Sequence, residues 1–272
     1  MRDGLRDALA RSDASASALS AAGATPLRGS IADLDVLRAG AEQADGVISL
    51  AFAHDVDTPD ALDRSIAAEA AAMATLGEAL VGSGKPMVTV SGTPWIAGRA
   101  STEHDPLSEV GPVAGRARSV TALLDLATRG VRASAVRMPR TVHENGEGGF
   151  AGLLTEAARA RGAVGYPGDG WQRWPSVHAR DAASLFRLAL ESAPAGTAWH
   201  AVADEGIPVS EIATVIARRL GVATEKVPAE ELGPFGAIFA MDQPASSAHT
   251  REVLGWEPTH PGLLEDLENV RA

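Results

Sequence analysis

Several residue types are absent or scarce in this 272-residue sequence, and each absence excludes a class of function. It has no cysteine, which excludes disulfides, thiol nucleophiles and thiolate metal sites and is compatible with a reducing compartment. No apolar run approaches the roughly 18 residues that a membrane-spanning helix needs. The amino-terminal segment carries charges where a secretory signal would be apolar. We therefore expect a cytoplasmic protein with no membrane partner.

Basic residues are also in deficit. The chain has 24 Lys and Arg against 35 Asp and Glu, which gives a formal net charge of −11, and its basic residues form no cluster. Nucleic-acid binding depends on Lys and Arg side chains that neutralise phosphates. We therefore expect a small-molecule substrate and no nucleic-acid partner, while the composition leaves the oligomeric state open.

Short apolar runs alternate with longer alanine-rich segments in the first half of the sequence. Residues 45 to 52, 85 to 93 and 131 to 139 are mostly apolar and too short for typical helices, so they are predicted to be buried strands. Helices are predicted between them, one that Thr58 caps and one that ends at Gly130. This alternation is typical of an α/β fold with a Rossmann-type, doubly wound parallel sheet.

The pattern is less regular after residue 140, where glycine and proline interrupt it. Helices are predicted over residues 150 to 161, 181 to 191 and 210 to 220, the last with Ser210 as its cap and Gly221 as its stop.

The change in pattern suggests two parts. We expect an incomplete dinucleotide-binding type of domain over residues 1 to 140 and mainly a smaller substrate lobe over residues 141 to 272. Residues 197 to 203 form a further strand candidate that returns to the sheet of the first domain.

The stretch GDGWQRWPSVHARDAASLFRLAL, residues 168 to 190, resembles a segment of the extended short-chain dehydrogenase/reductases, the NAD(P)-dependent epimerase/dehydratase family. Further segments resemble that family in the expected order: LARSD from residue 9, VSGT from 90, VRMP from 136 and REVLGWEPTHPGLLEDL from 251. The resemblance covers nearly the whole chain. It implies a Rossmann fold, NAD(P) binding and oxidoreductase chemistry, with this chain as an atypical member.

The first departure from the family is at the amino end. A dinucleotide site needs a strand, a glycine-rich turn and a helix whose N-terminus faces the pyrophosphate, and residues 1 to 10 are too few to supply them. The stretch GEGGFA from Gly146 matches the glycine pattern only formally, because it does not directly follow a strand. We expect NADP or NAD to bind poorly to the chain as given. A sequence short of its natural start is the explanation that we favour.

The second departure concerns the catalytic residues. The family uses a Tyr four residues before a Lys, with a Ser or Thr that holds the carbonyl oxygen. The resemblance aligns Pro112 with the Tyr and Arg116 with the Lys, and the single tyrosine, Tyr166, lies elsewhere. Thr93 stands at the Ser/Thr position. We therefore expect Thr93 to polarise a carbonyl and Arg116 to keep the cationic role.

The resemblance also assigns cofactor-binding residues. Arg11 and Ser12 are expected beside the adenosine ribose, where an arginine favours the 2′-phosphate and so NADP over NAD. The other positions run along the cofactor from adenine to nicotinamide: Ser30, Ile31, Leu50, Ala51, Phe52, Arg137 and Pro139. For Leu50, Ala51, Phe52 and Pro139, ordinary packing in the core or at strand ends is an equal alternative.

In the substrate lobe, Arg173 is expected to bind an anionic group, because a guanidinium fork suits phosphate or carboxylate. Trp171 is expected to wall a pocket and His178 to contribute to substrate binding. The alternative is that Asp181 caps the following helix and His178 is a hydrogen-bonded strut.

Two functions of different classes therefore remain open. One is an NAD(P)-dependent oxidoreductase or epimerase-like enzyme that acts on a small carbonyl or sugar-like substrate. The other is a cofactor-free binding or regulatory protein that keeps the fold, since a fold alone does not choose between them.

Overall fold

The computed structural model describes residues 7–52, 58–110 and 113–268. The chain divides into two compact units, and each is described by itself. The first unit comprises Met1–Thr89, Glu109–Ser134 and Pro194–Gly196, and the second comprises Val90–Ser108, Ala135–Ala193 and Thr197–Ala272.

The first unit opens with a parallel strand pair joined by a helix. Strand β1 (Asp7–Ala10) pairs in parallel with β2 (Thr25–Arg28), and α1 (Asp13–Ala21) makes the crossover between them. Ser12 caps this helix, because its hydroxyl accepts the backbone N–H of Ser15 at 3.1 Å. Within the described residues, β1 and β2 form a two-stranded sheet of their own.

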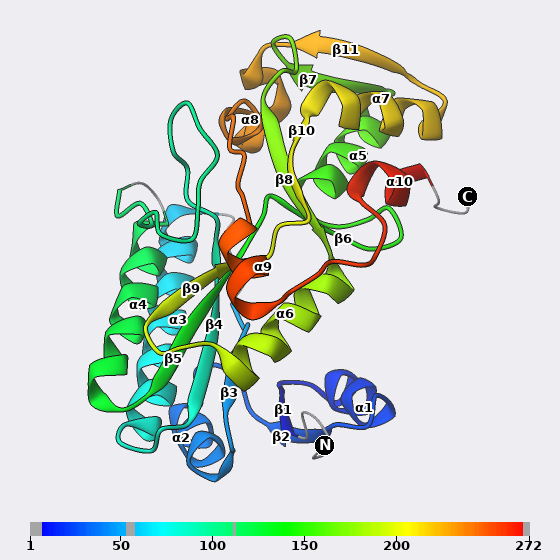
Figure 1. The fold of residues 1–272 in the computed structure, drawn as a ribbon. Helices are drawn as coiled ribbons and strands as arrows, with labels where there is room; N and C mark the ends of the chain where they lie inside the picture. The colour runs from blue at the N-terminus through cyan, green and yellow to red at the C-terminus, as the bar shows by residue number, and fades with distance from the viewer. Residues whose placement is uncertain (1–6, 53–57, 111–112, 269–272) are drawn as a thin grey trace. The chain divides into compact units, whose positions relative to one another are not determined.

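The unit continues with further strands and helices. Its remaining elements are α2 (Leu34–Gln43), β3 (Val47–Ser49), α3 (Pro59–Leu80), α4 (Ala114–Asp125) and the 3-10 turn η1 (Leu126–Arg129). Helix α3 packs against both α2 and α4 (Figure 1). Strand β3 pairs in parallel with β4 (Pro86–Gly92), and the sheet continues in the order β3-β4-β5-β9, where β5 is Arg132–Met138 and β9 is Thr197–His200.

Most local predictions for this part are confirmed. Thr58 caps α3, the strands predicted near residues 85 to 93 and 131 to 139 are β4 and β5, and Gly130 ends η1 in the left-handed conformation. The prediction of a buried strand over residues 45 to 52 is wrong in extent, because β3 has three half-buried residues. Within the described residues it is an edge strand, with β4 as its partner on one side.

The second unit contains the remaining elements: β6 (Thr141–His143), α5 (Gly149–Arg161), β7 (Ala163–Pro167), β8 (Arg173–His178), α6 (Ala179–Ser192), β10 (Asp204–Pro208), α7 (Val209–Leu220), β11 (Ala223–Val227), the 3-10 stretch η2 (Ala229–Phe235), α8 (Gly236–Phe239), α9 (Ala248–Leu254) and α10 (Leu263–Glu268). Strands β11 and β7 pair in parallel, and β8 lies between β10 and β6. The α/β fold with parallel sheets agrees with the prediction.

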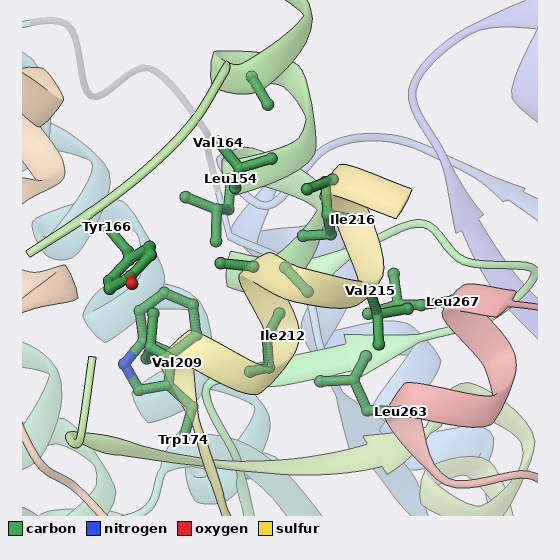
Figure 2. Close-up of a cluster of buried hydrophobic side chains, with 14 of the residues drawn as sticks. Leu154, Val164, Tyr166, Trp174, Val209, Ile212, Val215, Ile216, Leu263 and Leu267 are labelled. Atoms are coloured by element: carbon green, nitrogen blue, oxygen red, sulfur yellow. The ribbon is translucent and has the colours of Figure 1, made fainter. Parts of the chain in front are cut away.

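A hydrophobic cluster holds this unit together (Figure 2). Helix α7 supplies apolar side chains such as Ile212 and Ile216, which its helical spacing places on one face. Tyr166 and Trp174 pack into the same cluster from β7 and β8. The sole tyrosine of the sequence is therefore 9% exposed and belongs to the core.

Two predicted helix caps are wrong. Helix α7 begins at Val209 with Pro208 as its cap, and the backbone N–H of Ser210 donates to the carbonyl of Gly170 at 3.0 Å. Helix α6 has His178 as its cap, so the alternative that Asp181 caps it is not met. The Asp181 carboxylate, which a cap would use, instead accepts the N–H groups of Thr259 and His260 at 3.0 Å.

In the part of the chain that the structure describes, no helix is both long and apolar enough to cross a membrane.

The burial of His200, at the end of β9, leads us to expect that the free energy of unfolding decreases at acidic pH. Its side chain is fully buried, Nδ1 donates to the carbonyl of Ser246 at 2.8 Å, and burial lowers its pKa from 6.5 to about 4. The unfolded chain therefore binds a proton that the folded chain excludes between these two pH values. Stability should decrease on the order of 2 kcal/mol from pH 7 to pH 5 through this residue.

Urea unfolding at both pH values measures this effect. The variant His200→Asn should lose less stability on acidification than the wild type, whereas the exposed control His104→Asn should behave like the wild type. An equal pH dependence in all three proteins contradicts the assignment.

Candidate active site

Thr93 directly follows the carboxyl end of β4 and is held by its main chain. It is 6% exposed, and its N–H donates to the carbonyl of Met138, at the end of the neighbouring strand β5, at 2.9 Å. The side-chain amide of Gln243 donates to the Thr93 carbonyl at 2.7 Å and approaches Oγ1 at 3.5 Å. The main-chain groups are thus engaged, whereas the hydroxyl has one long contact within the part of the chain that the structure describes.

Residues Met241 to Gln243, here called the 241–243 segment, follow α8 and connect several predicted site residues. Gln243 contacts Thr93, and its own N–H donates to the carbonyl of Arg173 at 3.0 Å. The carbonyl of Asp242 accepts the indole N–H of Trp95 at 3.0 Å. This short irregular segment therefore joins the end of β4 to the start of β8.

Arg173, the predicted anion-binding residue, already has an anion from its own chain. Asp242 accepts its backbone N–H at 2.7 Å, its Nε at 3.0 Å and its Nη2 at 2.9 Å. These hydrogen bonds lower the pKa of the Asp242 carboxyl and raise that of the guanidinium. The positive charge of Arg173 is therefore matched within the fold.

A second arginine beside the segment has no such partner. Nη2 of Arg140 contacts the thioether of Met241 at 3.6 Å, and the guanidinium lies 5.0 Å from the ring centre of Phe150. Its Nε is buried and has no hydrogen-bond partner in the described part of the chain. Burial lowers the pKa of Arg140 to about 10, so it remains cationic at neutral pH.

The aromatic residues of the predicted lobe motif lie in different environments. Trp174 is fully buried, and its ring packs against Phe150 and Phe239 with centroids 5.8 and 5.3 Å away. Trp171 precedes β8 and is 66% exposed. The side chain of Gln172, between them, donates to the carbonyls of Pro167 and Phe239 at 3.3 Å.

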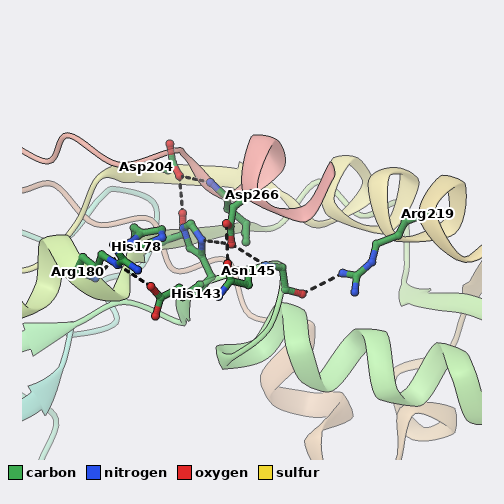
Figure 3. A network of polar contacts seen from close by, with 11 residues as sticks. His143, Asn145, His178, Arg180, Asp204, Arg219 and Asp266 are labelled. Carbon is green, nitrogen blue, oxygen red and sulfur yellow. Dashed lines mark hydrogen bonds and ion pairs between the residues drawn. The ribbon is translucent and has the colours of Figure 1, made fainter. Parts of the chain in front are cut away.

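His178 lies in a network of its own (Figure 3). It contacts His143 edge to face at 5.5 Å and stacks on His260 at 4.7 Å, and its Nδ1 accepts the N–H of Arg180. Burial, with a smaller effect of the two neighbouring imidazoles, lowers the pKa of His178. Asp266 accepts Nδ1–H of His143 at 2.9 Å. None of these contacts involves the 241–243 segment.

Arg137 and Pro139, predicted on the nicotinamide side, lie on either side of Met138, the last residue of β5. The guanidinium of Arg137 is buried and donates to the carbonyls of Glu103 and Asp105 at 3.2 and 2.7 Å. Arg137 therefore holds a loop of its own unit. Pro139 is buried directly after the strand.

Arg116, the predicted catalytic cation, lies on α4 of the first unit. Its Nε and Nη2 donate to both oxygens of the buried Glu69 on α3 at 2.8 Å, and its guanidinium covers the ring of Phe52 at 4.4 Å. This bidentate pair matches its charge. Pro112, at the position of the family's tyrosine, lies outside the described residues.

The residues predicted near the adenosine lie where β1 and β2 end. Arg11 is exposed, and Ser12 caps α1. Ser30 forms a turn in which Asp33 accepts its N–H at 2.7 Å and its hydroxyl at 2.9 Å. Arg28 donates to the carbonyl of Ser12 and to Asp13, both at 2.6 Å.

The other members of the predicted cofactor set follow β2 and β3. Ile31 and Phe52 are half-buried, Leu50 is 53% exposed and Ala51 is also exposed. Leu50 and Ala51 are therefore not core residues of this unit, contrary to the packing alternative.

The glycine-rich stretch before α5 is engaged by its own chain. The N–H of Gly146 donates to Asp266 at 2.9 Å, and that of Phe150 donates to the carbonyl of Arg140 at 3.2 Å. Gly149 has φ +55°, and a Cβ there would lie 2.6 Å from Cα of Thr141. Close backbone approach therefore accounts for this glycine. Among the described residues, no group of His, Cys, Asp or Glu side chains could hold a metal ion.

Arg140, Met241, Asp242 and Gln243 were not among the predicted site residues. Gln243 and Thr93 are separated by 150 positions, and the 241–243 segment has no periodic pattern. The one available signal was Arg140, which directly follows the predicted strand that ends at Pro139.

Comparison with solved structures defines the class of fold. A dTDP-glucose 4,6-dehydratase, DesIV of Streptomyces venezuelae, solved with NAD and TYD bound, superposes with a TM-score of 0.75 at 18% identity over 97% of this chain and 85% of its own. A UDP-glucose 4-epimerase of Thermotoga maritima, solved with UDP-glucose, gives 0.70 at 19% identity over 92% and 84%. The chain thus has the Rossmann-type fold that these epimerases and dehydratases share.

Sequence comparison identifies the family. No family model matches the chain. The uncharacterized protein C2A9.02 of Schizosaccharomyces pombe is 41% identical over 95% of this chain and 88% of its own length. The uncharacterized protein YLL056C of Saccharomyces cerevisiae is 36% identical over the same shares. The chain belongs to the family that includes these two yeast proteins.

Loss of the ion pair between Arg173 and Asp242 should measurably destabilise the protein. Asp242→Asn removes the charge that receives three donors of one residue, so the free energy of unfolding should decrease by about 1.5–3 kcal/mol. Asp169→Asn is the control, because Asp169 and Lys226 form an exposed pair that should contribute less than about 1 kcal/mol. Equal losses in urea unfolding contradict a special role for Asp242.

Proposed function

We propose that the protein is an NAD(P)-dependent oxidoreductase or epimerase-like enzyme that acts on a small carbonyl or sugar-like substrate. The observation that carries this proposal is the position of Thr93, a buried residue directly after the carboxyl end of a parallel strand. Ligands of α/β sheets bind outside these strand ends. The fold supports the proposal, since solved proteins that share it include complexes with NAD.

Thr93 is the residue that contacts the substrate in this account. Its N–H and carbonyl are engaged by Met138 and Gln243, which orient the residue, while its hydroxyl has one long contact at 3.5 Å. The hydroxyl is therefore free to donate to the oxygen of a carbonyl as negative charge develops there. A nicotinamide cofactor, when bound, supplies or accepts the hydride.

The described residues fit one half of the cofactor. The exposed Arg11 directly follows a strand of a parallel pair and presents a cation suited to a 2′-phosphate, which favours NADP. A pyrophosphate also needs backbone donors at a glycine-rich turn. The turn before α5 directs the N–H groups of Gly146 and Phe150 to its own chain. We therefore propose that the chain as printed binds the dinucleotide weakly.

Calorimetric titration tests the cofactor assignment. The 272-residue chain should bind NADPH with a dissociation constant above about 100 μM, and NADH more weakly. Arg11→Ala should reduce the ratio of NADPH affinity to NADH affinity by about 10- to 100-fold, because it removes a charge-assisted contact of about 1.5–3 kcal/mol with the 2′-phosphate. Arg64→Ala, an exposed change on α3, is the control. Low-micromolar affinity contradicts the weak binding, and an unchanged preference contradicts the role of Arg11.

Steady-state reduction of small aldehydes and ketones, at the highest soluble NADPH concentration, tests the role of Thr93. Thr93→Val keeps the shape and removes the donor, so turnover should decrease by about 10²–10³-fold. Tyr166→Phe removes the only phenol, which packs in the core, and should leave turnover within about twofold of the wild type.

The opposite pattern, in which Tyr166→Phe abolishes turnover and Thr93→Val does not, contradicts this active site. Absence of turnover and of cofactor binding in all proteins favours the other function, a binding or regulatory protein. The internal pairing of Arg116 with Glu69 is the observation that supports this second function, because it engages the predicted catalytic cation.

A further inference from the structure

The two arginines beside the 241–243 segment differ in one respect that indicates a ligand. Arg173 has a carboxylate from its own chain, Asp242, whereas Arg140 has an aromatic ring and a thioether. Sulfur is a weak acceptor, and the buried Nε of Arg140 has no acceptor among the described residues. A guanidinium whose Nε is buried without an acceptor is costly, and an incoming anion offsets that cost.

The surroundings of Arg140 hold it rigidly. The ring of Phe150 lies under the guanidinium and packs edge to face against Trp174 and at 5.6 Å against Phe239. The carbonyl of Arg140 accepts the N–H of Phe150 at 3.2 Å. The cation is therefore positioned before any ligand binds, which reduces the entropic cost of binding.

Arg140 also belongs to the same group of contacts as Thr93. Thr93 is hydrogen-bonded to Met138, two residues before Arg140, and to Gln243, two residues after the Met241 that Arg140 touches. Two separate chain segments thus connect the hydroxyl and the guanidinium. Thr93 directly follows β4 and Arg140 lies two residues after β5, so both lie where neighbouring strands of one sheet end.

We propose that Arg140 binds an oxyanion, a carboxylate or a phosphate, on the substrate whose carbonyl Thr93 contacts. The inference rests on the proposed function for the carbonyl, but the oxyanion site itself depends only on Arg140. It assigns the substrate to the class of small carbonyl compounds that carry a negative charge. Arg173, with its internal partner, stabilises the site instead of binding that charge.

Thermal unfolding without cofactor tests the oxyanion site by itself. Inorganic phosphate and glyoxylate should raise the midpoint temperature of the wild type, because a ligand that binds only the folded state stabilises it. Acetone, which has a carbonyl and no charge, should leave it unchanged. In Arg140→Met, the affinity for both anions should decrease by about 30-fold or more. Arg187→Met, an exposed control on α6, should respond like the wild type.

The ligand-free midpoint of Arg140→Met provides an independent test. Removing a half-buried cation that has no carboxylate partner among the described residues should leave the protein as stable as the wild type or more so. A large destabilisation or a failure to fold shows that Arg140 is structural, and this overturns the proposal. Arg140→Lys should retain part of the anion response, because it keeps the charge but not the fork.

These outcomes separate the two proposals. If Arg140→Met abolishes anion binding and the wild type reduces no carbonyl compound, the oxyanion site is supported and the enzymatic function is rejected. If carbonyl reduction requires Thr93 but neither anion stabilises the wild type, only the oxyanion site is rejected and the enzymatic function is supported. An equal anion response in the wild type and Arg140→Met also rejects it.

Discussion

Asp242 makes the interaction on which the candidate site depends. One carboxylate accepts three donors of Arg173, and this fixes the 241–243 segment to the first residue of β8. This fixes the two residues that flank Asp242. Gln243 then contacts Thr93, and Met241 contacts Arg140. The same carboxylate matches the charge of Arg173, whereas Arg140 has no carboxylate partner among the described residues. This division of roles between two neighbouring cations is the physical basis of the proposed site.

The elements could be predicted where local patterns decide them. Thr58 and Gly130 begin and end their helices through contacts within those helices, so the predicted cap at Thr58 and the predicted helix end at Gly130 were correct. The caps at Ser210 and Asp181 were wrong, and in both cases the chain around the residue is held by a distant segment. Gly170 accepts the N–H of Ser210, and Asp181 accepts the N–H groups of residues 259 and 260.

The site could be predicted only in part. The family resemblance selects Thr93, Arg116 and Arg173, whose functional roles stay predictions. The partners of these two arginines, Glu69 and Asp242, lie 47 and 69 positions away, and spacing does not reveal them. Arg140 is informative only once the structure shows that it lacks such a carboxylate. The sequence shows which residues are charged, but which charged residues pair with one another is known only from the folded structure.

The central claim is that one small molecule contacts Thr93 and Arg140 together. A crystal structure of the protein grown with carboxylated aldehydes of increasing chain length tests this most directly. The account predicts a ligand whose carboxylate lies within about 2.7–3.2 Å of the Arg140 guanidinium and whose carbonyl oxygen lies at a similar distance from the Thr93 hydroxyl. Ligand density away from both residues, or a carboxylate bound to Arg173 with Asp242 displaced, contradicts it.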